Sequence, residues 1–145
     1  MSQHQITLER HFRAPPAAVF AAMADHETFG QIWPGRTQRI REGEDAPNGV
    51  GSVRRISVGP ISLEETTTTH EPDSLIEYTI TRGSPLRNHH GRIALSPQGE
   101  GTQMHYVIRF ECRIPLLGGL IARQLERDFH RGVEPWAARL EAGTA

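Results

Sequence analysis

Three side chains that can transfer protons lie on segments predicted to be β-strands. They are a carboxylate, a phenol and an imidazole, at Glu64, Tyr78 and His89. If one pocket held all three, they could act as general acids and bases. Their spacing matches no dyad or triad that a particular reaction requires at fixed intervals. We therefore treat the catalytic residues as unknown, with Glu64, Tyr78 and His89 as candidates.

The sequence lacks the residues that several other chemistries require. All 16 basic residues are arginine, so Schiff-base chemistry and a phosphate-binding P-loop are excluded. The single Cys112 excludes an intramolecular disulfide and a multi-cysteine metal site. His89 and His90 are adjacent on a predicted strand and so point to opposite faces, which prevents them from sharing a metal ion. We expect neither a metal nor a cofactor.

Charge and length also limit the function. The 16 basic and 17 acidic residues leave no strong field for nucleic acid. No apolar run is long enough to span a bilayer, and the N-terminal residues lack a signal-peptide core. We expect a single domain over residues 1–145, soluble in a reducing bacterial cytoplasm, as a monomer or homodimer.

Secondary-structure elements must position these residues. The longest of them is a helix predicted at the C-terminal end, over residues 115–140. Its apolar residues recur at steps of three and four, which is the spacing of one helical face: Leu117, Ile121, Leu125, Phe129, Val133, Trp136 and Leu140. Gly132 and Pro135 interrupt the pattern, but the apolar stripe continues in phase beyond them. We therefore expect a kink near Gly132 rather than a break.

The rest of the chain is predicted to be mostly strand. Residues 4–13 alternate as a half-buried strand, residues 17–23 form a short helix, and Asp25 caps a second short helix that ends at Phe29. Six further strands are predicted at 37–42, 51–58, 61–70, 75–82, 89–96 and 102–113, with short turns between them. Short connections favour antiparallel neighbours, so the class is α+β.

This order of elements carries local signatures along nearly the whole chain. They are APPAAVF at 14–20, Trp33-Pro34, Leu63-Glu64, EPDSLIEY at 71–78, Gly91, Gly101-Thr102 and PLLG at 115–118. In this order they resemble the polyketide cyclase/dehydrase branch of the START-like (SRPBCC, birch-pollen-allergen-like) superfamily. The resemblance implies a helix-grip fold, in which a curved antiparallel sheet of seven strands wraps the long helix. It also implies an internal cavity for an apolar or aromatic molecule.

The turn around residues 98–100 sets which side chains would face the cavity. If residue 97 pairs with 102, one face carries the pairs Leu95 with Met104, Ile93 with Tyr106, Gly91 with Ile108, and His89 with Phe110. A slip of one residue would exchange the two faces, and the apolar pattern argues against it.

The neighbouring strand pair places one glutamate inside. Ile76, Tyr78 and Ile80 face inward, and a tight turn at 71–73 would set Thr68, Thr66 and Glu64 opposite them. Glu64 would then need a partner such as Arg55, because an unpaired buried charge is costly. A loop one residue longer or shorter would turn Glu65 inward instead.

The expected function is to bind a small hydrophobic or aromatic molecule, lipid-like or polyketide-like, between the sheet and the long helix. Two alternatives remain open: an aromatase, cyclase or dehydratase that uses general acid/base catalysis, and a co-chaperone-like interaction module. The expected ligand-binding residues are Trp33, Arg55, Glu64, Tyr78, His89, Tyr106, Phe110, Ile121, Leu125 and Phe129.

Overall fold

The structure, a computed structural model, describes residues 2–143, so residues 1, 144 and 145 of the expected domain lie outside the described residues. Its elements follow in the predicted order: β1 (Ser2–Phe12), α1 (Pro16–Ala24), α2 (His26–Gly30), β2 (Arg36–Arg41), β3 (Val53–Val58), β4 (Ile61–Glu71), β5 (Leu75–Arg82), β6 (Arg87–Gln98), β7 (Gly101–Cys112) and α3 (Leu117–Glu141). The expected fold class is therefore confirmed.

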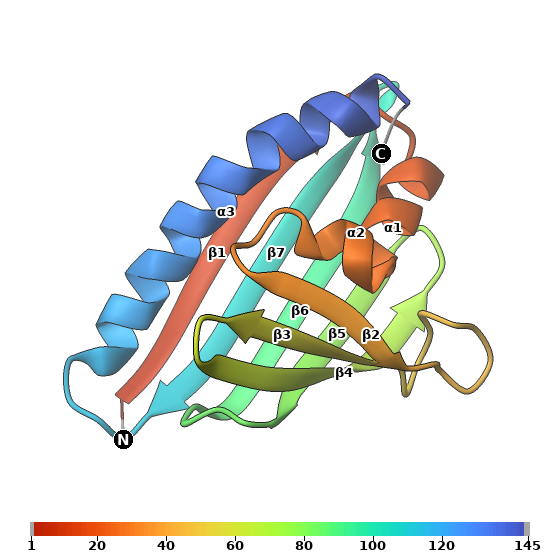
Figure 1. Ribbon diagram of the computed structural model, residues 1–145. Helices are drawn as coiled ribbons and strands as arrows, with labels where there is room; N and C mark the ends of the chain where they lie inside the picture. The colour runs from red at the N-terminus through yellow and green to blue at the C-terminus, as the bar shows by residue number, and fades with distance from the viewer. Residues whose placement is uncertain (1, 144–145) are drawn as a thin grey trace.

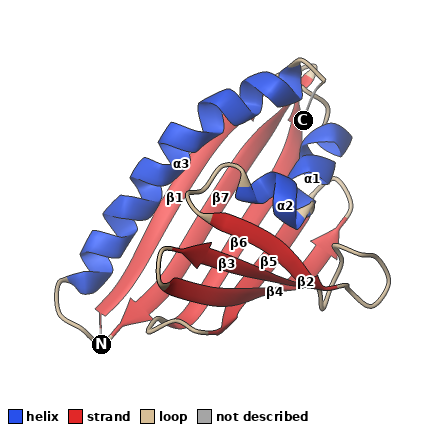
Figure 2. Cartoon of the chain, in the orientation of Figure 1, coloured by secondary structure: helices blue, strands red, loops and turns tan. Residues whose placement is uncertain are grey.

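The strands form one antiparallel sheet in the order β1-β7-β6-β5-β4-β3-β2. In Figure 1 the sheet curves so that β2, β3 and β4 turn toward the viewer, while α3 runs along β1 and β7. The short helix α1 contacts α3, β6 and β7, and α2 contacts β2, at the opposite edge of the sheet from β1 (Figure 2). This is the helix-grip arrangement, with the long helix held in the concave side of the sheet.

Local chemistry explains the short helices. Pro16 occupies the first turn of α1, where a missing N–H costs nothing. Asp25 caps α2, and its Oδ1 accepts from the backbone N–H of Glu27 at 3.1 Å and of Thr28 at 2.9 Å. The cap fixes the direction of α2 and thereby buries His26 and Phe29.

The pairing of β6 with β7 confirms the predicted register at Leu95 with Met104, Ile93 with Tyr106, and Gly91 with Ile108. The exception is His89, because the register shifts between Arg87 and His90 and the expected pairing with Phe110 is absent. The inward face is buried as predicted. His90 lies on the opposite face, with Nε2 at 2.9 Å from a Glu77 carboxylate oxygen.

The helix α3 continues through Gly132 and Pro135 without a break, as expected. Its C-terminal half packs into the core, where Phe129, Val133 and Trp136 are almost fully buried. The Trp136 indole N–H also donates to the Thr28 carbonyl at 2.9 Å. In the N-terminal half of α3, Ile121 and Leu125 are only partly buried, because the space beneath them is not filled by side chains.

Candidate functional site

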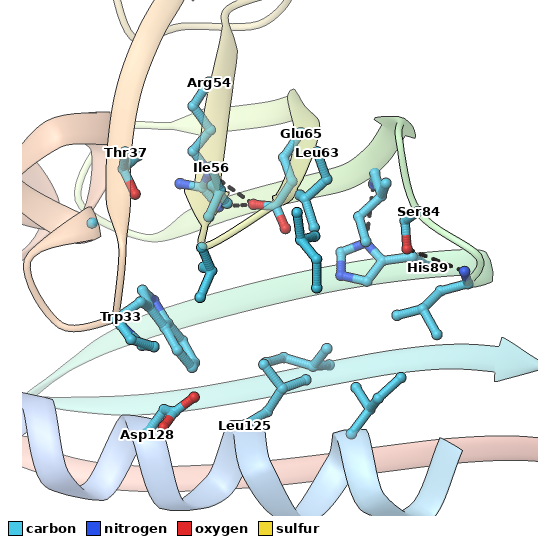
Figure 3. A pocket seen from close by; sticks show the side chains of 18 of the residues that line it. Trp33, Thr37, Arg54, Ile56, Leu63, Glu65, Ser84, His89, Leu125 and Asp128 are labelled. Atoms are coloured by element: carbon cyan, nitrogen blue, oxygen red, sulfur yellow. Dashed lines mark hydrogen bonds and ion pairs between the residues drawn. The ribbon is translucent and has the colours of Figure 1, made fainter. Parts of the chain in front are cut away.

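A partly enclosed cavity of about 470 Å³ lies between the curved sheet and the N-terminal half of α3. Its surface is almost entirely apolar. Aliphatic side chains line it from β3, β4, β5 and α3: Ile56, Val58, Ile61, Leu63, Ile80, Leu117, Ile121 and Leu125. Figure 3 shows Leu125 and Asp128 of α3 facing Ile56, Leu63 and Glu65 across this space. The cavity implied by the family resemblance is therefore present.

The main polar feature of the cavity is an ion pair between Arg54 and Glu65. The two residues are direct partners on β3 and β4 and are only 5% and 8% exposed. The Nε of Arg54 donates to Oε1 of Glu65 at 2.8 Å, and an Nη lies 2.6 Å from the same oxygen. The guanidinium also lies over the Tyr78 ring, 4.5 Å from its centroid. Burial alone would lower the pKa of Arg54, but Glu65, with further contributions from Tyr78 and Tyr106, holds it above its usual value.

The prediction that Glu64 and Arg55 face inward is wrong. They pair with each other at 3.4 Å on the outside of the sheet, where the Arg55 side chain is 46% exposed. The reason is a β-bulge: the β4–β5 register shifts between Thr67 and Thr69, so Tyr78 lies opposite Thr67. The one extra residue transfers the inward position from Glu64 to Glu65.

Behind the ion pair, His26 and Ser52 extend the polar network into the core. The Nδ1 of His26 lies 3.5 Å from an Nη of Arg54, and its Nε2 lies 2.8 Å from the Ser52 hydroxyl. Burial, reinforced by the positive charge of Arg54, lowers the pKa of His26 from 6.5 to about 3. His26 is therefore a neutral support for Arg54 rather than a cavity residue, since it does not line the cavity.

His89 lines the cavity and is held by an unusual backbone contact. β5 and β6 pair regularly only from Leu75 to Tyr78, and beyond this point the Ile80 N–H donates to Nδ1 of His89 at 3.0 Å. This bond leaves the ring proton of the neutral imidazole on Nε2. Burial lowers the pKa of His89, although the Glu65 carboxylate opposes that shift.

Tyr78 and Tyr106 join their hydroxyl groups in a buried hydrogen bond. Burial raises the pKa of both phenols well above the ordinary value, so both are neutral. The Tyr78 ring has room because Gly91 lies opposite it in the ladder. A Cβ built on Gly91 would come within 2.2 Å of the ring. Tyr78 also lies beside His89, with ring centroids 5.6 Å apart.

The structure divides the expected ligand-binding residues into three groups. Trp33, Tyr78, His89, Ile121 and Leu125 line the cavity. Three others, Tyr106, Phe110 and Phe129, are buried in the core beside it and do not line it. Arg55 and Glu64 lie outside, as described above. Of the three candidate catalytic residues, Tyr78 and His89 come together, and Glu65 takes the place expected for Glu64.

The cavity residues Arg54, Glu65 and Asp128 were not among the expected ligand-binding residues, although Glu65 was the stated alternative to Glu64. The first two differ by one position from the predicted pair, so the residue types on these strands indicated a charged pair but not its face. Asp128 precedes Phe129 on α3 and lies at the edge of the apolar stripe. Its place in the cavity is shown by the structure and was not indicated by the apolar pattern of α3.

Comparisons with known proteins agree with this geometry. A START superfamily protein from Mycobacterium smegmatis matches with a TM-score of 0.76 at 14% identity, over 94% of this chain and 99% of that one. A norcoclaurine synthase point mutant from Thalictrum flavum matches at 0.71 and 11% identity, over 95% and 96%. The Aha1 dimer from Colwellia psychrerythraea matches at 0.71 and 12%, over 98% and 99%. At these identities the likeness shows the fold alone.

Comparison of the sequence itself, rather than of the fold, identifies the family of the protein. No curated protein matches this sequence. Among the described residues, no helix has both the length and the apolar character that a membrane span requires. The model of the family described as polyketide cyclase/dehydrase and lipid transport matches residues 3–141, which confirms the resemblance. Because that match extends over almost the whole chain, the protein belongs to the polyketide cyclase/dehydrase and lipid-transport family.

Proposed function

We propose that this protein binds a small, largely apolar or aromatic molecule, lipid-like or polyketide-like, in the cavity between the sheet and α3. The volume of about 470 Å³ falls within the range of about 300–1,000 Å³ typical of small-molecule pockets. The aromatic rings of Phe29, Trp33 and Tyr78 add flat apolar surface to the lining.

One observation carries this proposal: apolar side chains line an unfilled space that lies directly beside the buried core of the protein. Ile121 and Leu125 continue the stripe of α3 that buries Phe129 and Val133, yet they border the cavity. Protein cores are normally packed to the density of organic crystals, and an empty apolar cavity sacrifices dispersion contacts. A ligand that fills the space would restore those contacts.

The test is a titration with the neutral fluorescent probe N-phenyl-1-naphthylamine. We expect a saturable rise in fluorescence and a higher unfolding temperature, since a ligand at about 100 times its Kd adds about 2.7 kcal/mol of stability. Ile121→Trp would fill the cavity from α3 and weaken probe binding by at least about tenfold. The matched control is Leu120→Trp, because Leu120 is 61% exposed and does not line the cavity.

Two results would reject the proposal. One is a wild-type protein that shows no saturable binding of the probe or of fatty acids, sterols, flavonoids and aromatic polyketides. The other is equal probe binding by Ile121→Trp and Leu120→Trp, because binding would then occur elsewhere on the surface. Circular dichroism of both variants verifies that each is folded.

General acid/base catalysis on the bound molecule is a second candidate function, favoured because Glu65, His89 and Tyr78 line the same cavity. A carboxylate and an imidazole at one site could move protons during ring closure and loss of water from a poly-β-ketone chain. Incubation with a β-ketoacyl thioester, followed by mass spectrometry, would detect the loss of water. Activity that persists in Glu65→Gln would contradict a role for that carboxylate.

A further inference from the structure

The two oxygens of the Glu65 carboxylate have different environments. Every hydrogen bond and ion-pair contact that Glu65 makes with the described residues uses Oε1. Figure 3 shows the second oxygen directed away from Arg54 and toward the cavity. Glu65 therefore presents one hydrogen-bond acceptor, Oε2, to whatever occupies the cavity.

His89 presents the complementary group. Its Nδ1 accepts from the Ile80 N–H, so the neutral ring carries its proton on Nε2. No described residue bonds to Nε2. Within the described residues, every fully buried side-chain nitrogen or oxygen has a hydrogen-bond partner. Since Nε2 of His89 and Oε2 of Glu65 have none, both must be accessible, and both residues line the cavity.

The strand order places this acceptor and this donor at one end of the cavity. Glu65 lies opposite Ile80 in the β4–β5 ladder, and Ile80 in turn donates to His89 on β6. In Figure 3 the Glu65 and His89 side chains project into the same part of the cavity. The adjacent surface is the Tyr78 ring, whose hydroxyl is already bonded to that of Tyr106.

From this geometry we infer that the ligand carries a hydroxyl group, whose O–H donates to Oε2 of Glu65 and whose oxygen accepts from Nε2–H of His89. A hydroxyl is the smallest uncharged group that donates and accepts at one atom. The inference rests on the proposed function and narrows its ligands to neutral apolar or aromatic alcohols and phenols.

Other head groups fit this end of the cavity less well. An ether or ketone could accept from His89 but would leave the Glu65 oxygen without a donor. A carboxylate would place a second negative charge against Glu65, and Asp128 adds another acidic side chain to the lining. Arg54 cannot offset that repulsion, because its guanidinium is already engaged by Glu65 and lies against His26.

Four ligands with one ring system test the inference by calorimetry at neutral pH: 2-naphthol, 2-methoxynaphthalene, 2-methylnaphthalene and 2-naphthoate. We expect 2-naphthol to bind at least about tenfold more tightly than each of the other three. Glu65→Gln replaces the accepting oxygen with a donating NH₂ and should reduce that preference to less than about threefold. Glu64→Gln makes the same change on the outer face and should leave the preference intact.

The wild-type series decides the question even if Glu65→Gln fails to fold. Equal affinity for 2-naphthol and 2-methylnaphthalene would overturn the hydroxyl inference while the proposed hydrophobic binding stands. Tightest binding of 2-naphthoate would also overturn it, in favour of an anion site at Arg54. If none of the four ligands and no hydrophobic probe binds, the proposed function itself fails.

Discussion

The backbone carbonyl of Ile32 lies against Gly132 in the middle of α3. A Cβ built on Gly132 would stand 1.7 Å from the Ile32 oxygen and 2.7 Å from its carbonyl carbon. The segment after α2 can therefore approach the long helix only because residue 132 has no side chain. This contact brings the neighbouring Trp33 against Phe129, with ring centroids 5.8 Å apart, at the border of the cavity.

The contact predicts that Gly132→Ala destabilises the protein, although alanine is the better helix former by about 1 kcal/mol. Because backbone atoms of Ile32 would have to move, we expect a loss of at least about 2 kcal/mol, measured by urea unfolding. Gly119→Ala is the matched control in the same helix. A Cβ there meets nothing within 4 Å, so this variant should gain up to about 1 kcal/mol. Stabilisation by both variants would contradict the close approach.

The two faces of α3 predict opposite tolerance to charge. Phe129 is 1% exposed and packs against Tyr106 and Trp33, so Phe129→Arg should cost at least about 3 kcal/mol and abolish ligand uptake. Arg127 lies on the exposed face, and Arg127→Glu should change stability by less than about 0.5 kcal/mol. Equal effects in equilibrium unfolding would mean that the two faces are misassigned.

The buried ion pair predicts strong coupling between Arg54 and Glu65. Arg54→Met or Glu65→Leu alone leaves a buried charge without its partner, which costs about 3–5 kcal/mol. The double variant removes both charges and should cost much less than the two single losses combined. The exposed pair Arg55 and Glu64 offers a parallel cycle, in which we expect a coupling of no more than about 1 kcal/mol. Additive losses at the buried pair would argue against a direct interaction.

His26 predicts a loss of stability in acid. Its pKa is about 3 in the folded protein and 6.5 ordinarily, so between these values the unfolded chain binds a proton that the folded chain does not. Stability therefore falls as the pH drops from 6.5 toward 3, by about 1.4 kcal/mol per pH unit from this group. Above pH 6.5 both states are neutral and the effect vanishes.

Chemical denaturation at a series of pH values measures that slope. His26→Asn also loses hydrogen bonds, which lowers stability at every pH, but it should remove this part of the slope. His105→Asn alters a partly exposed histidine that pairs with Glu9 on the outer face and should retain the His26 contribution. A His26→Asn curve parallel to that of the wild type would show that His26 does not titrate in this way.

The parts of this fold that depend on local repetition could be predicted from the sequence. The stripe from Leu117 to Leu140 repeats every three or four residues, and such a stripe can form only one helical face. The β6–β7 hairpin has a short turn and a clear alternation of apolar residues. These two features allowed its register to be predicted correctly between Leu95 and Gly91. Asp25 before a short helix likewise predicted its cap.

By itself, then, the sequence determined the order of the elements and the inward face of β6 and β7. Tertiary structure alone decided which charges enter the cavity and how closely α3 approaches Ile32. The bulge at Thr68 exchanged Glu64 for Glu65, since one unpaired residue reverses the faces of the side chains on one side of the bulge relative to those on the other. Neither the bulge nor the contact at Gly132 follows from a periodic pattern in the chain, and the contact depends on packing between segments far apart in the sequence.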